Sequence, residues 1–352
     1  MATTLLFRRP IATSSRLFNA ATPLRKPNMS FRAQHTLSTY LVSPSTLSAA
    51  LKANPPPKDT ISTAPRTIPL CGSWFLPNDP EKRTGYAAFL RSRIPTARFF
   101  DLDAISDTTS PYPHMLPTPS TFASAMSQLG IHRDDILVVY DTPDLGIFSA
   151  PRVAWTLRLM GHPAVHILNN YRLWSEQGYP TESGEPNQKQ PYQQTTYPTP
   201  ETVDTSRVAT FEHVRELARD LNKEGHEPFQ ILDARSAGRW RGTDPEPRPG
   251  LSSGHIPGST NVPLPELLDA DTKAFKTKEE LRKVFESRGV VDGVPIVTSC
   301  GTGVMAAALE AAVLEAGFGV AEVQGGLRVY DGSWTEWAQR VGPTEGLIVK
   351  SG

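Results

Sequence analysis

Cysteine is scarce in this sequence, and long apolar runs are absent from it. Cys71 and Cys300 are the two cysteines among 352 residues. Two cysteines cannot build the disulfide framework of a small secreted domain, and they suit a reducing compartment. No apolar run approaches the roughly 18 residues that a membrane-spanning helix needs. The composition therefore excludes a disulfide-stapled scaffold, and no association with a membrane is expected.

Acidic residues are missing from the first part of the chain. No Asp or Glu precedes Asp59, whereas Arg and Lys are scattered among Ser, Thr, Ala and Leu before residue 37. This composition is typical of a mitochondrial transit peptide, which we predict for residues 1–36; a basic tail without a targeting role is the alternative. Met29 offers a second start that would omit most of the signal. Residence in the cytoplasm as well as in mitochondria is therefore a hypothesis.

The charge of the whole chain is balanced, with 36 Lys and Arg against 36 Asp and Glu. Because part of the positive charge lies in the N-terminal segment, the rest of the chain is mildly acidic. A non-specific nucleic-acid binder would carry the opposite balance, so no direct nucleic-acid binding is expected. The length of 352 residues predicts two domains.

A cysteine between a predicted strand and a predicted helix is the strongest chemical signal. The residues 296–299 form an apolar, β-branched run that is typical of a buried strand, and Cys300 follows it. Gly301 and Gly303 then lead into an Ala-rich run that predicts a helix as far as Ala316. Such a loop directs backbone N–H groups toward one point, which favours a thiolate at Cys300. Cysteine is often only a small buried side chain, but this context indicates a nucleophile.

The loop Cys300-Gly-Thr-Gly-Val-Met-Ala resembles the active-site loop of the two-domain sulfurtransferases, the rhodanese and 3-mercaptopyruvate sulfurtransferase family. The mercaptopyruvate type carries Cys-Gly-Ser/Thr-Gly-Val-Thr-Ala, whereas the thiosulfate type has basic residues after the cysteine. Met305 stands where Thr is usual, which leaves the substrate preference open. The segments 72–77, 93–103 and 106–117 are also similar to family signatures, so the resemblance covers most of the chain.

The two halves of the sequence share one order of motifs. Ile94 corresponds to Ile256, Tyr140-Asp141 to Ser299-Cys300, and Asn169-Asn170 to Gly325-Gly326. Together with the resemblance, this repeat predicts an α/β fold of two tandem rhodanese-like domains, each a parallel sheet flanked by helices. Asp141 stands where the second copy has its cysteine, so only the C-terminal copy is expected to be catalytic.

The expected organisation follows from these signals. Its parts are a transit peptide at 1–36, a non-catalytic domain at 37–180, a Pro/Gln-rich linker at 181–206, a catalytic domain at 207–342 and a tail at 343–352. Periodicity predicts helices over 121–130, 150–160 and 208–221, and strands over 136–140, 164–168 and 229–235.

The resemblance implies substrate-binding residues in the second half. The segment from Gly238 to Arg248 is similar to the family pattern Gly-Arg-Phe-x-Gly-x-x-Pro-Glu-Pro-Arg, whose first and last arginines hold the substrate carboxylate. These positions are Arg239 and Arg248, and a planar guanidinium binds a carboxylate through two charge-assisted hydrogen bonds. The role of Arg241 stays open. The N–H groups of Gly301, Gly303 and Val304 belong to the cradle that would hold the transferred sulfur.

The resemblance also implies a proton-handling group. Asp103 and His114 of the first half match positions that lie across the cleft from a loop hydroxyl, here Thr302. A His that is oriented by a carboxylate and touches a hydroxyl suits proton transfer; a His that only bridges two loops is the alternative. We interpret Cys71 as a structural residue, His255 as part of a turn, and the segment from Tyr330 to Trp337 as a packing element.

These residues predict a ping-pong transfer in which Cys300 takes sulfur from 3-mercaptopyruvate as a persulfide and passes it to thioredoxin, another thiol or cyanide. A thiosulfate sulfurtransferase and a sulfur-relay protein for tRNA thiolation are the alternatives. A Cys-based phosphatase would need an Arg six residues after the nucleophile, where the chain has Ala306. The resemblance implies no metal or organic cofactor, and a monomer is expected.

Overall fold

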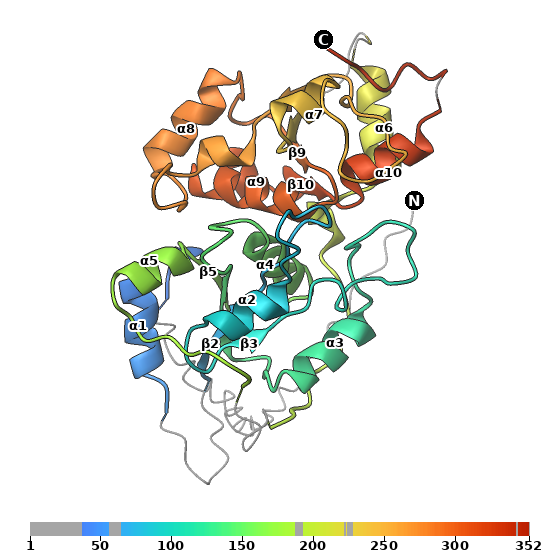
Figure 1. Cartoon of the computed structure of the whole chain (residues 1–352). Helices are drawn as coiled ribbons and strands as arrows, with labels where there is room; N and C mark the ends of the chain where they lie inside the picture. Colours follow the sequence, from blue (N-terminus) through green and yellow to red (C-terminus); the bar gives the residue numbers. More distant parts are fainter. Residues whose placement is uncertain are drawn as a thin grey trace, which may run out of the picture. The chain divides into compact units, whose positions relative to one another are not determined.

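The computed structural model of the chain describes residues 37–55, 65–186, 193–221, 223, 228–342 and 344–351. The predicted transit peptide lies outside the described residues, as do residues 187–192 of the predicted linker. The described chain forms two parallel five-stranded sheets, one after the other along the sequence (Figure 1). Both sheets belong to the same compact unit.

The first sheet has the strand order β1-β5-β4-β2-β3, with β4 in the centre and every strand pair parallel. Each of the five residues of β4 is buried, as expected for a parallel strand covered on both faces. The elements of this copy are β1 Leu41–Val42, α1 Pro44–Lys52, β2 Thr67–Cys71, α2 Gly85–Arg91, β3 Arg98–Phe99, α3 Pro119–Gln128, β4 Ile136–Tyr140, α4 Ala150–Leu159, β5 Val165–Leu168 and α5 Tyr171–Glu176.

The second sheet has the order β6-β10-β9-β7-β8 and is also parallel throughout. Its strands occupy the same places in the order as those of the first sheet, which confirms the predicted tandem α/β fold. The elements of this copy are η1 Thr205–Arg207, β6 Val208–Ala209, α6 Phe211–Asp220, β7 Gln230–Asp233, α7 Ala237–Arg241, β8 Ser259–Asn261, η2 Leu264–Leu267, α8 Lys278–Ser287, β9 Ile296–Ser299, α9 Val304–Glu315, η3 Gly319–Glu322, β10 Leu327–Tyr330 and α10 Ser333–Arg340.

One pair of the predicted repeat positions is wrong. The sheet orders make β5 the counterpart of β10, so Asn169-Asn170, which follow β5, correspond to Asp331-Gly332. Gly325-Gly326 instead precede β10. Sequence spacing was misleading because the connection from α9 to β10 contains η3, and no such turn is assigned between α4 and β5 in the described chain.

The predicted helix over 208–221 is also wrong at its start. Val208–Ala209 form the edge strand β6, and Val208 pairs with Val329 of β10. The helix α6 begins after Thr210, whose hydroxyl accepts a hydrogen bond from the His213 N–H at 3.2 Å. A strand of two residues is too short for a periodic pattern to separate from the helix that follows it. The run that begins at Phe229 is therefore not the first strand of this copy.

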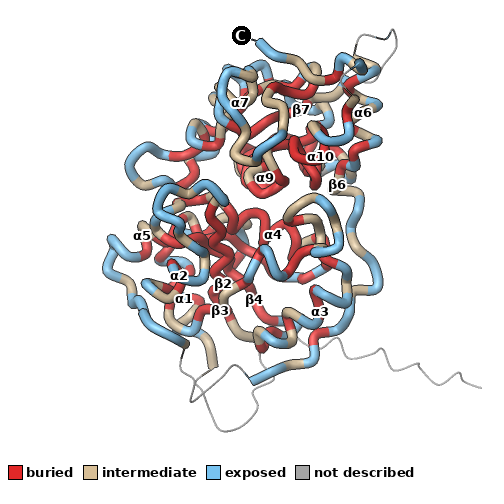
Figure 2. Tube along the Cα trace, turned by 45° about the vertical axis from the view of Figure 1, so that its right-hand side comes forward, coloured by how far each residue is buried: buried red, intermediate tan, exposed pale blue. Residues whose placement is uncertain are grey.

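The helices α4 and α9 pack against each other, and both are buried over most of their lengths (Figure 2). Each of them follows the central strand of its own sheet. The small side chains of α9, such as Ala307, Ala308 and Ala311, allow close packing on several sides. The two loops that precede these helices are consequently brought to the contact between the copies. Among the described residues, the structure assigns no helix with the length and apolar character required to cross a membrane.

Candidate active site

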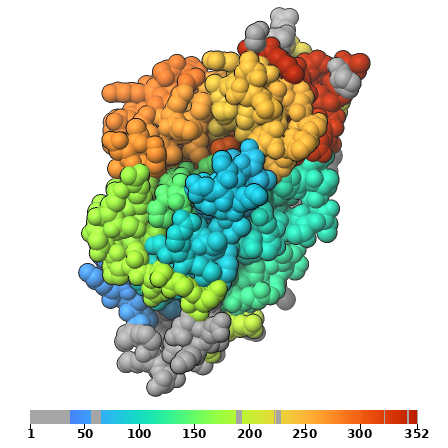
Figure 3. Space-filling view, viewed as in Figure 1, coloured from blue at the N-terminus to red at the C-terminus, as the bar shows by residue number. Residues whose placement is uncertain are grey.

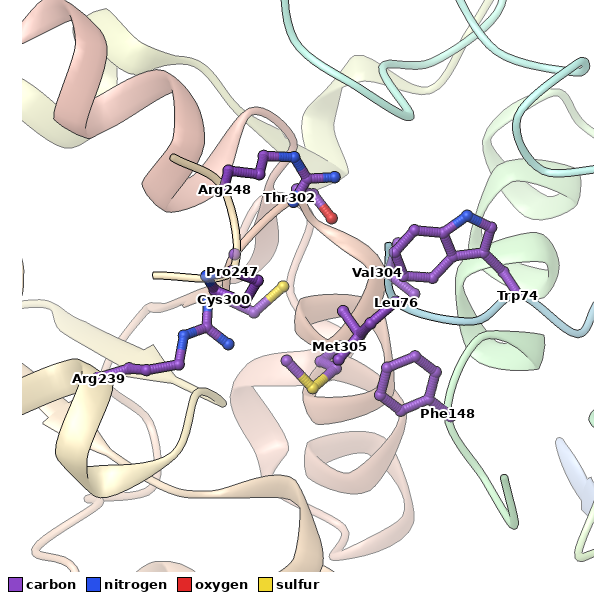
Figure 4. A pocket seen from close by; sticks show the side chains of 11 residues that line it. Trp74, Leu76, Phe148, Arg239, Pro247, Arg248, Cys300, Thr302, Val304 and Met305 are labelled. Carbon is purple, nitrogen blue, oxygen red and sulfur yellow. The ribbon is translucent and has the colours of Figure 1, made fainter. Parts of the chain in front are cut away.

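Cys300 lies directly after β9 and four residues before Val304, the first residue of α9. Only 1% of the residue is exposed, and its side chain lines a cavity. Trp74, Leu76 and Phe148 of the first copy form part of the wall. Figure 4 shows the sulfur of Cys300 pointing into the space between these apolar side chains and two arginines. Figure 3 shows the outer surface where the segments near residues 75 and 245 meet.

The Cys300 loop is held by α10, which the sequence had indicated only as a packing element. The Cys300 N–H donates to Ser333 Oγ at 3.2 Å, and the Cys300 carbonyl accepts from the Trp334 N–H at 3.0 Å. The Gly301 carbonyl accepts from the N–H and the hydroxyl of Thr335, at 2.9 and 2.8 Å. Within the described chain, the N–H groups from Gly301 to Val304 have no hydrogen-bond acceptor. The start of α9 therefore offers several free donors beside the thiol.

The corresponding loop of the first copy is closed by its own carboxylate. Asp141 accepts hydrogen bonds from the N–H groups of Phe148, Ser149 and Ala150, at 2.8 to 3.0 Å, and from the Ser149 hydroxyl at 2.6 Å. Asp141 follows β4 as Cys300 follows β9. The fold thus places an anion at this point in one copy, and it places an unoccupied set of donors next to a cysteine in the other copy.

Two arginines of the predicted carboxylate site line the same cavity as Cys300. Arg239 forms a salt bridge with Glu246, and its guanidinium lies 3.1 Å from the position that a Cβ at Gly301 would occupy. Arg248 makes no hydrogen bond within the described chain, and burial together with the nearby Arg239 lowers the pKa of its guanidinium. Arg248 is therefore available to an anionic ligand, whereas Arg239 is already oriented.

Arg241, whose role the sequence left open, is exposed and lies outside the cavity lining. It lies on α7 with Arg239, two residues further on, so the helix directs the two side chains to different sides. The structure does not bring Arg241 together with Cys300.

His114 connects the two copies at the other side of the cysteine loop. Its Nδ1 lies 3.2 Å from Thr302 Oγ1, and its Nε2 lies 3.0 Å from Asp103 Oδ1. Trp74 Nε1 also donates to the Asp103 carboxylate, at 3.1 Å, and the indole packs edge-on against the imidazole. The predicted Asp103, His114 and Thr302 thus form one continuous chain of hydrogen bonds. A second hollow, lined by Asp103, His114 and Arg248, adjoins this chain.

The pKa values of both His114 and Asp103 are lowered, for different reasons. Burial is the largest influence on His114 and lowers its imidazole pKa below 6.5, although the hydrogen bond that the ring donates to Asp103 opposes this shift. The bond to His114 lowers the carboxyl pKa of Asp103. Near neutral pH the group therefore holds a neutral imidazole and a carboxylate, and Nε2–H donates to Asp103. Nδ1 is then free to accept the proton of the Thr302 hydroxyl.

The two residues that we interpreted as structural lie away from the site. Cys71 is fully buried in a core of the first copy, and burial raises the pKa of its thiol to about 12. His255 stacks on Trp240 with 3.8 Å between ring centroids, and its Nδ1 lies 2.8 Å from the Trp240 carbonyl oxygen. Neither residue lines the cavity at Cys300.

Several residues of the site were not found from the sequence. Glu246 holds Arg239 and is itself shared with the buried Arg235, at 2.9 Å. Ser333 supports the Cys300 N–H, and Asp331 contacts the His114 loop through the Leu116 N–H at 3.0 Å. The Glu lies inside the Pro-Glu-Pro-Arg segment, which was a usable signal. No sequence signal indicated Ser333 or Asp331, because the residues that they contact are distant in the sequence.

A cysteine near a helix N-terminus, between two guanidinium groups on a tandem parallel α/β fold, is an arrangement suited to the transfer of a group through a covalent bond to sulfur. The sequence model of the rhodanese-like domain family matches residues 213–340 of this chain. The thiosulfate sulfurtransferase TUM1 of Saccharomyces cerevisiae is 41% identical over 286 residues, which are 79% of this chain and 90% of that protein. The 3-mercaptopyruvate sulfurtransferase of Rattus norvegicus is 38% identical over 78% of this chain and 86% of its own length.

Solved structures agree with these relatives. The sulfur transferase subunit of yeast mitochondrial complex I, described as sub-stoichiometric, superposes with a TM-score of 0.74 at 35% identity. The match covers 89% of this chain and 100% of that one. The chain therefore belongs to the rhodanese family of two-domain sulfurtransferases, and it is a sulfurtransferase with a small-molecule donor and an acceptor.

Proposed function

We propose that the protein transfers sulfane sulfur from 3-mercaptopyruvate, through a persulfide on Cys300, to a thiol acceptor or to cyanide. The observation that carries this proposal is the shared cavity of Cys300, Arg239 and Arg248 at the unoccupied N–H groups of the loop. A keto acid thiol presents a carboxylate to the guanidinium groups and a sulfur to the cysteine. No basic side chain lies on the Gly-Thr-Gly loop itself.

The first half-reaction forms one bond and breaks another. Sγ of the Cys300 thiolate attacks the donor sulfur, so that an S–S bond forms while the donor C–S bond breaks. The electron pair of the C–S bond leaves with the methylene carbon as the enolate of pyruvate. The N–H groups from Gly301 to Val304 would stabilise the persulfide anion, as the start of α4 holds the Asp141 carboxylate.

The donor thiol proton ends on the methylene carbon, which makes pyruvate. Thr302 donates to His114 in the neutral state described above, so its oxygen lone pairs are free to accept this proton. Asp103 holds the imidazole in the required tautomer. We therefore assign proton transfer to Thr302, His114 and Asp103. In the second half-reaction an acceptor thiolate attacks the outer sulfur and restores the Cys300 thiolate.

A second donor, thiosulfate, is supported by the similarity to TUM1, which is named a thiosulfate sulfurtransferase. Arg239 and Arg248 would attract either anion. Thiosulfate leaves as sulfite and needs no proton, whereas mercaptopyruvate needs both the carboxylate site and the proton relay. We propose mercaptopyruvate as the main donor because the relay is complete.

The test is a steady-state assay of the purified enzyme with both donors, with cyanide as acceptor. Cys300→Ser should abolish turnover with both, and mass spectrometry of the donor-treated wild type should find an added mass of about 32 Da on the Cys300 peptide. Cys71→Ser is the matched control and should carry no change in activity. Retained turnover in Cys300→Ser would refute the assignment.

Arg248→Ala addresses the carboxylate site. It should raise KM for mercaptopyruvate more than KM for thiosulfate, because the bidentate contact to a carboxylate is lost. Arg241→Ala lies on the same segment but outside the cavity, and it should change neither value. An equal loss on both donors in Arg248→Ala would show that this residue attracts any anion and does not recognise the carboxylate.

We also propose that residues 1–36 target the protein to mitochondria. The first domain, 37–180, has no catalytic cysteine of its own, and it forms a wall of the site that carries Asp103 and His114. The mitochondrial complex I subunit among the similar structures supports the location. Start at Met29 would leave a cytoplasmic form. A monomer, and thioredoxin as the acceptor, complete the proposal. A sulfur relay toward tRNA would instead appear as persulfide transfer to a protein partner other than thioredoxin, and not to thioredoxin or a small thiol.

A further inference from the structure

Arg152 of α4 is a buried charge that the mechanism above does not use. Only 1% of the residue is exposed, although it belongs to the non-catalytic copy. Its Nη2 donates to the carbonyl oxygen of His114 and to Oδ1 of Asp331, at 2.5 Å each. Its Nε and Nη1 are buried without any hydrogen-bond partner in the structure. A buried guanidinium with two unpartnered nitrogens is costly, which calls for a reason other than packing.

The same guanidinium touches the cysteine loop. A Cβ at Gly303 would lie 2.7 Å from Arg152 Nη1 and 2.5 Å from the Asp331 carbonyl oxygen. Gly303 also has a φ of +79°, which disfavours a side chain. The loop between Cys300 and α9 is therefore pressed against Arg152 and Asp331, and glycine is needed for this close approach.

Arg152 and Asp331 together hold both sides of His114. Arg152 binds the His114 carbonyl, and Asp331 Oδ2 accepts from the Leu116 N–H at 3.0 Å. His114 itself has a φ of +63°, an uncommon conformation for a residue with a side chain. Three parts of the chain meet in this way: α4 and the His114 loop from the first copy, and the loop after β10 from the second.

We infer that Arg152 is a positioning residue that, with Asp331, sets His114 against Thr302 for proton transfer to the departing pyruvate carbon. The inference rests on the proposed function, because only a donor that needs a proton depends on this alignment. Arg152 does not touch the reacting atoms. It acts through the His114 backbone: one nitrogen, Nη2, makes both contacts, and it lies one bond further along the side chain than the ammonium of a lysine would.

The prediction separates the two donors. Arg152→Lys keeps the positive charge, but its ammonium ends one bond short of the position of Nη2, so His114 is no longer held. We expect kcat with mercaptopyruvate to fall about tenfold, a part of the usual effect of general acid–base catalysis, with KM little changed. Because sulfite leaves without a proton, kcat with thiosulfate should stay within about twofold of the wild type. Asp331→Asn should give the same split by releasing the other side of the loop.

Arg158→Gln is the matched control. Arg158 is on the same helix, also pairs with an acidic residue of the second copy, and does not line the cavity. Arg158→Gln should change kcat with mercaptopyruvate and kcat with thiosulfate by the same factor. A crystal structure of Asp331→Asn should show His114 Nδ1 further from Thr302 Oγ1 than 3.2 Å.

The outcomes are distinguishable. Equal losses with both donors in Arg152→Lys and Asp331→Asn, or no loss in either, would overturn the positioning role. A wild-type enzyme that does not use mercaptopyruvate would instead overturn the proposed donor, and with it the proton step.

Discussion

At the scale of single residues, the proposed mechanism depends on the protonation of His114. Three charged side chains lie near its imidazole: Asp103 accepts a hydrogen bond from it, and Arg152 and Arg248 oppose its protonation. Burial, the strongest influence, also favours the neutral ring. The two ends of the ring therefore have separate functions, with Nε2 bound to the carboxylate and Nδ1 to the hydroxyl.

A pH profile tests this assignment. Protonation of Nδ1 removes the acceptor of the Thr302 hydroxyl, so kcat/KM for mercaptopyruvate should fall as the pH falls through the imidazole pKa. That pKa is lowered, so the midpoint of the loss should lie below pH 6.5. Nuclear magnetic resonance titration of the His114 ring should give the same midpoint. With thiosulfate this acid limb should be absent.

Asp103→Asn sharpens the test. The loss of the carboxylate removes the interaction that raises the pKa of His114, so the acid limb should move to still lower pH. The plateau rate should also fall, because an amide does not enforce the tautomer. Asp107→Asn, a nearby residue of the adjoining hollow, should leave both unchanged. An acid limb that stays in place in Asp103→Asn would contradict the coupling.

At the scale of elements, the two helix N-termini that follow the central strands are used differently. The start of α4 is closed by Asp141, whereas the start of α9 has a glycine in place of a capping side chain. Helix N-termini normally bind a capping oxygen. The missing cap on α9 therefore leaves N–H groups for a ligand, and the Gly303 turn is the part of the loop that cannot be replaced.

Gly303→Ala should lower the free energy of unfolding by more than backbone strain alone would. Gly303 and Gly289 have nearly the same φ, +79° and +78°, but a Cβ at Gly289 meets nothing within 4 Å. Gly289→Ala should therefore cost about 1–2 kcal/mol of unfolding free energy, from its conformation only. Gly303→Ala adds a clash with the Asp331 backbone, so a larger loss and a fall in kcat are expected. Urea unfolding and a donor assay measure both, and equal costs for the two variants would count against the close approach.

At the scale of the whole molecule, the two copies are joined by buried ion pairs along α4. Arg158 binds Glu310 of α9 at 3.1 Å, and Glu310 is 1% exposed. Arg152 and Asp331 form a second pair across the same contact. Because the candidate site draws Trp74 and His114 from one copy and Cys300 from the other, we expect activity to depend on this contact.

Replacing one partner of the Arg158–Glu310 pair should lower the free energy of unfolding more than replacing both partners. Arg158→Met leaves the Glu310 carboxylate buried without a partner, and should lower the free energy of unfolding by about 3–5 kcal/mol. The double variant Arg158→Met, Glu310→Met should recover most of this loss, because no charge is then left buried. Arg172→Met breaks an exposed pair with Glu176 and should cost less than about 1 kcal/mol. Equal losses in the single and double variants would show that the charges do not interact.

The sequence by itself determined the parts of the protein that depend on neighbouring residues. The strand, Cys300, its glycines and the Ala-rich helix are contiguous, so their local geometry follows from residue type. The repeat predicted the tandem fold, and the resemblance supplied Arg239, Arg248, Asp103, His114 and Thr302 as candidates. The structure brings these five to one place with Cys300, while their chemical roles stay predictions.

Only the tertiary structure decided which distant groups hold these residues. The partners His114 and Thr302 are 188 positions apart, and Arg152 and Asp331 are 179 apart. No periodic pattern links residues at such separations, because their contact depends on how α4 packs against α9. The strand register likewise decided that Asp331 and not Gly325 is the counterpart of Asn169. The geometry of the Cys300 loop follows from adjacent residues, whereas the alignment of the site residues of the two copies depends on how the copies pack.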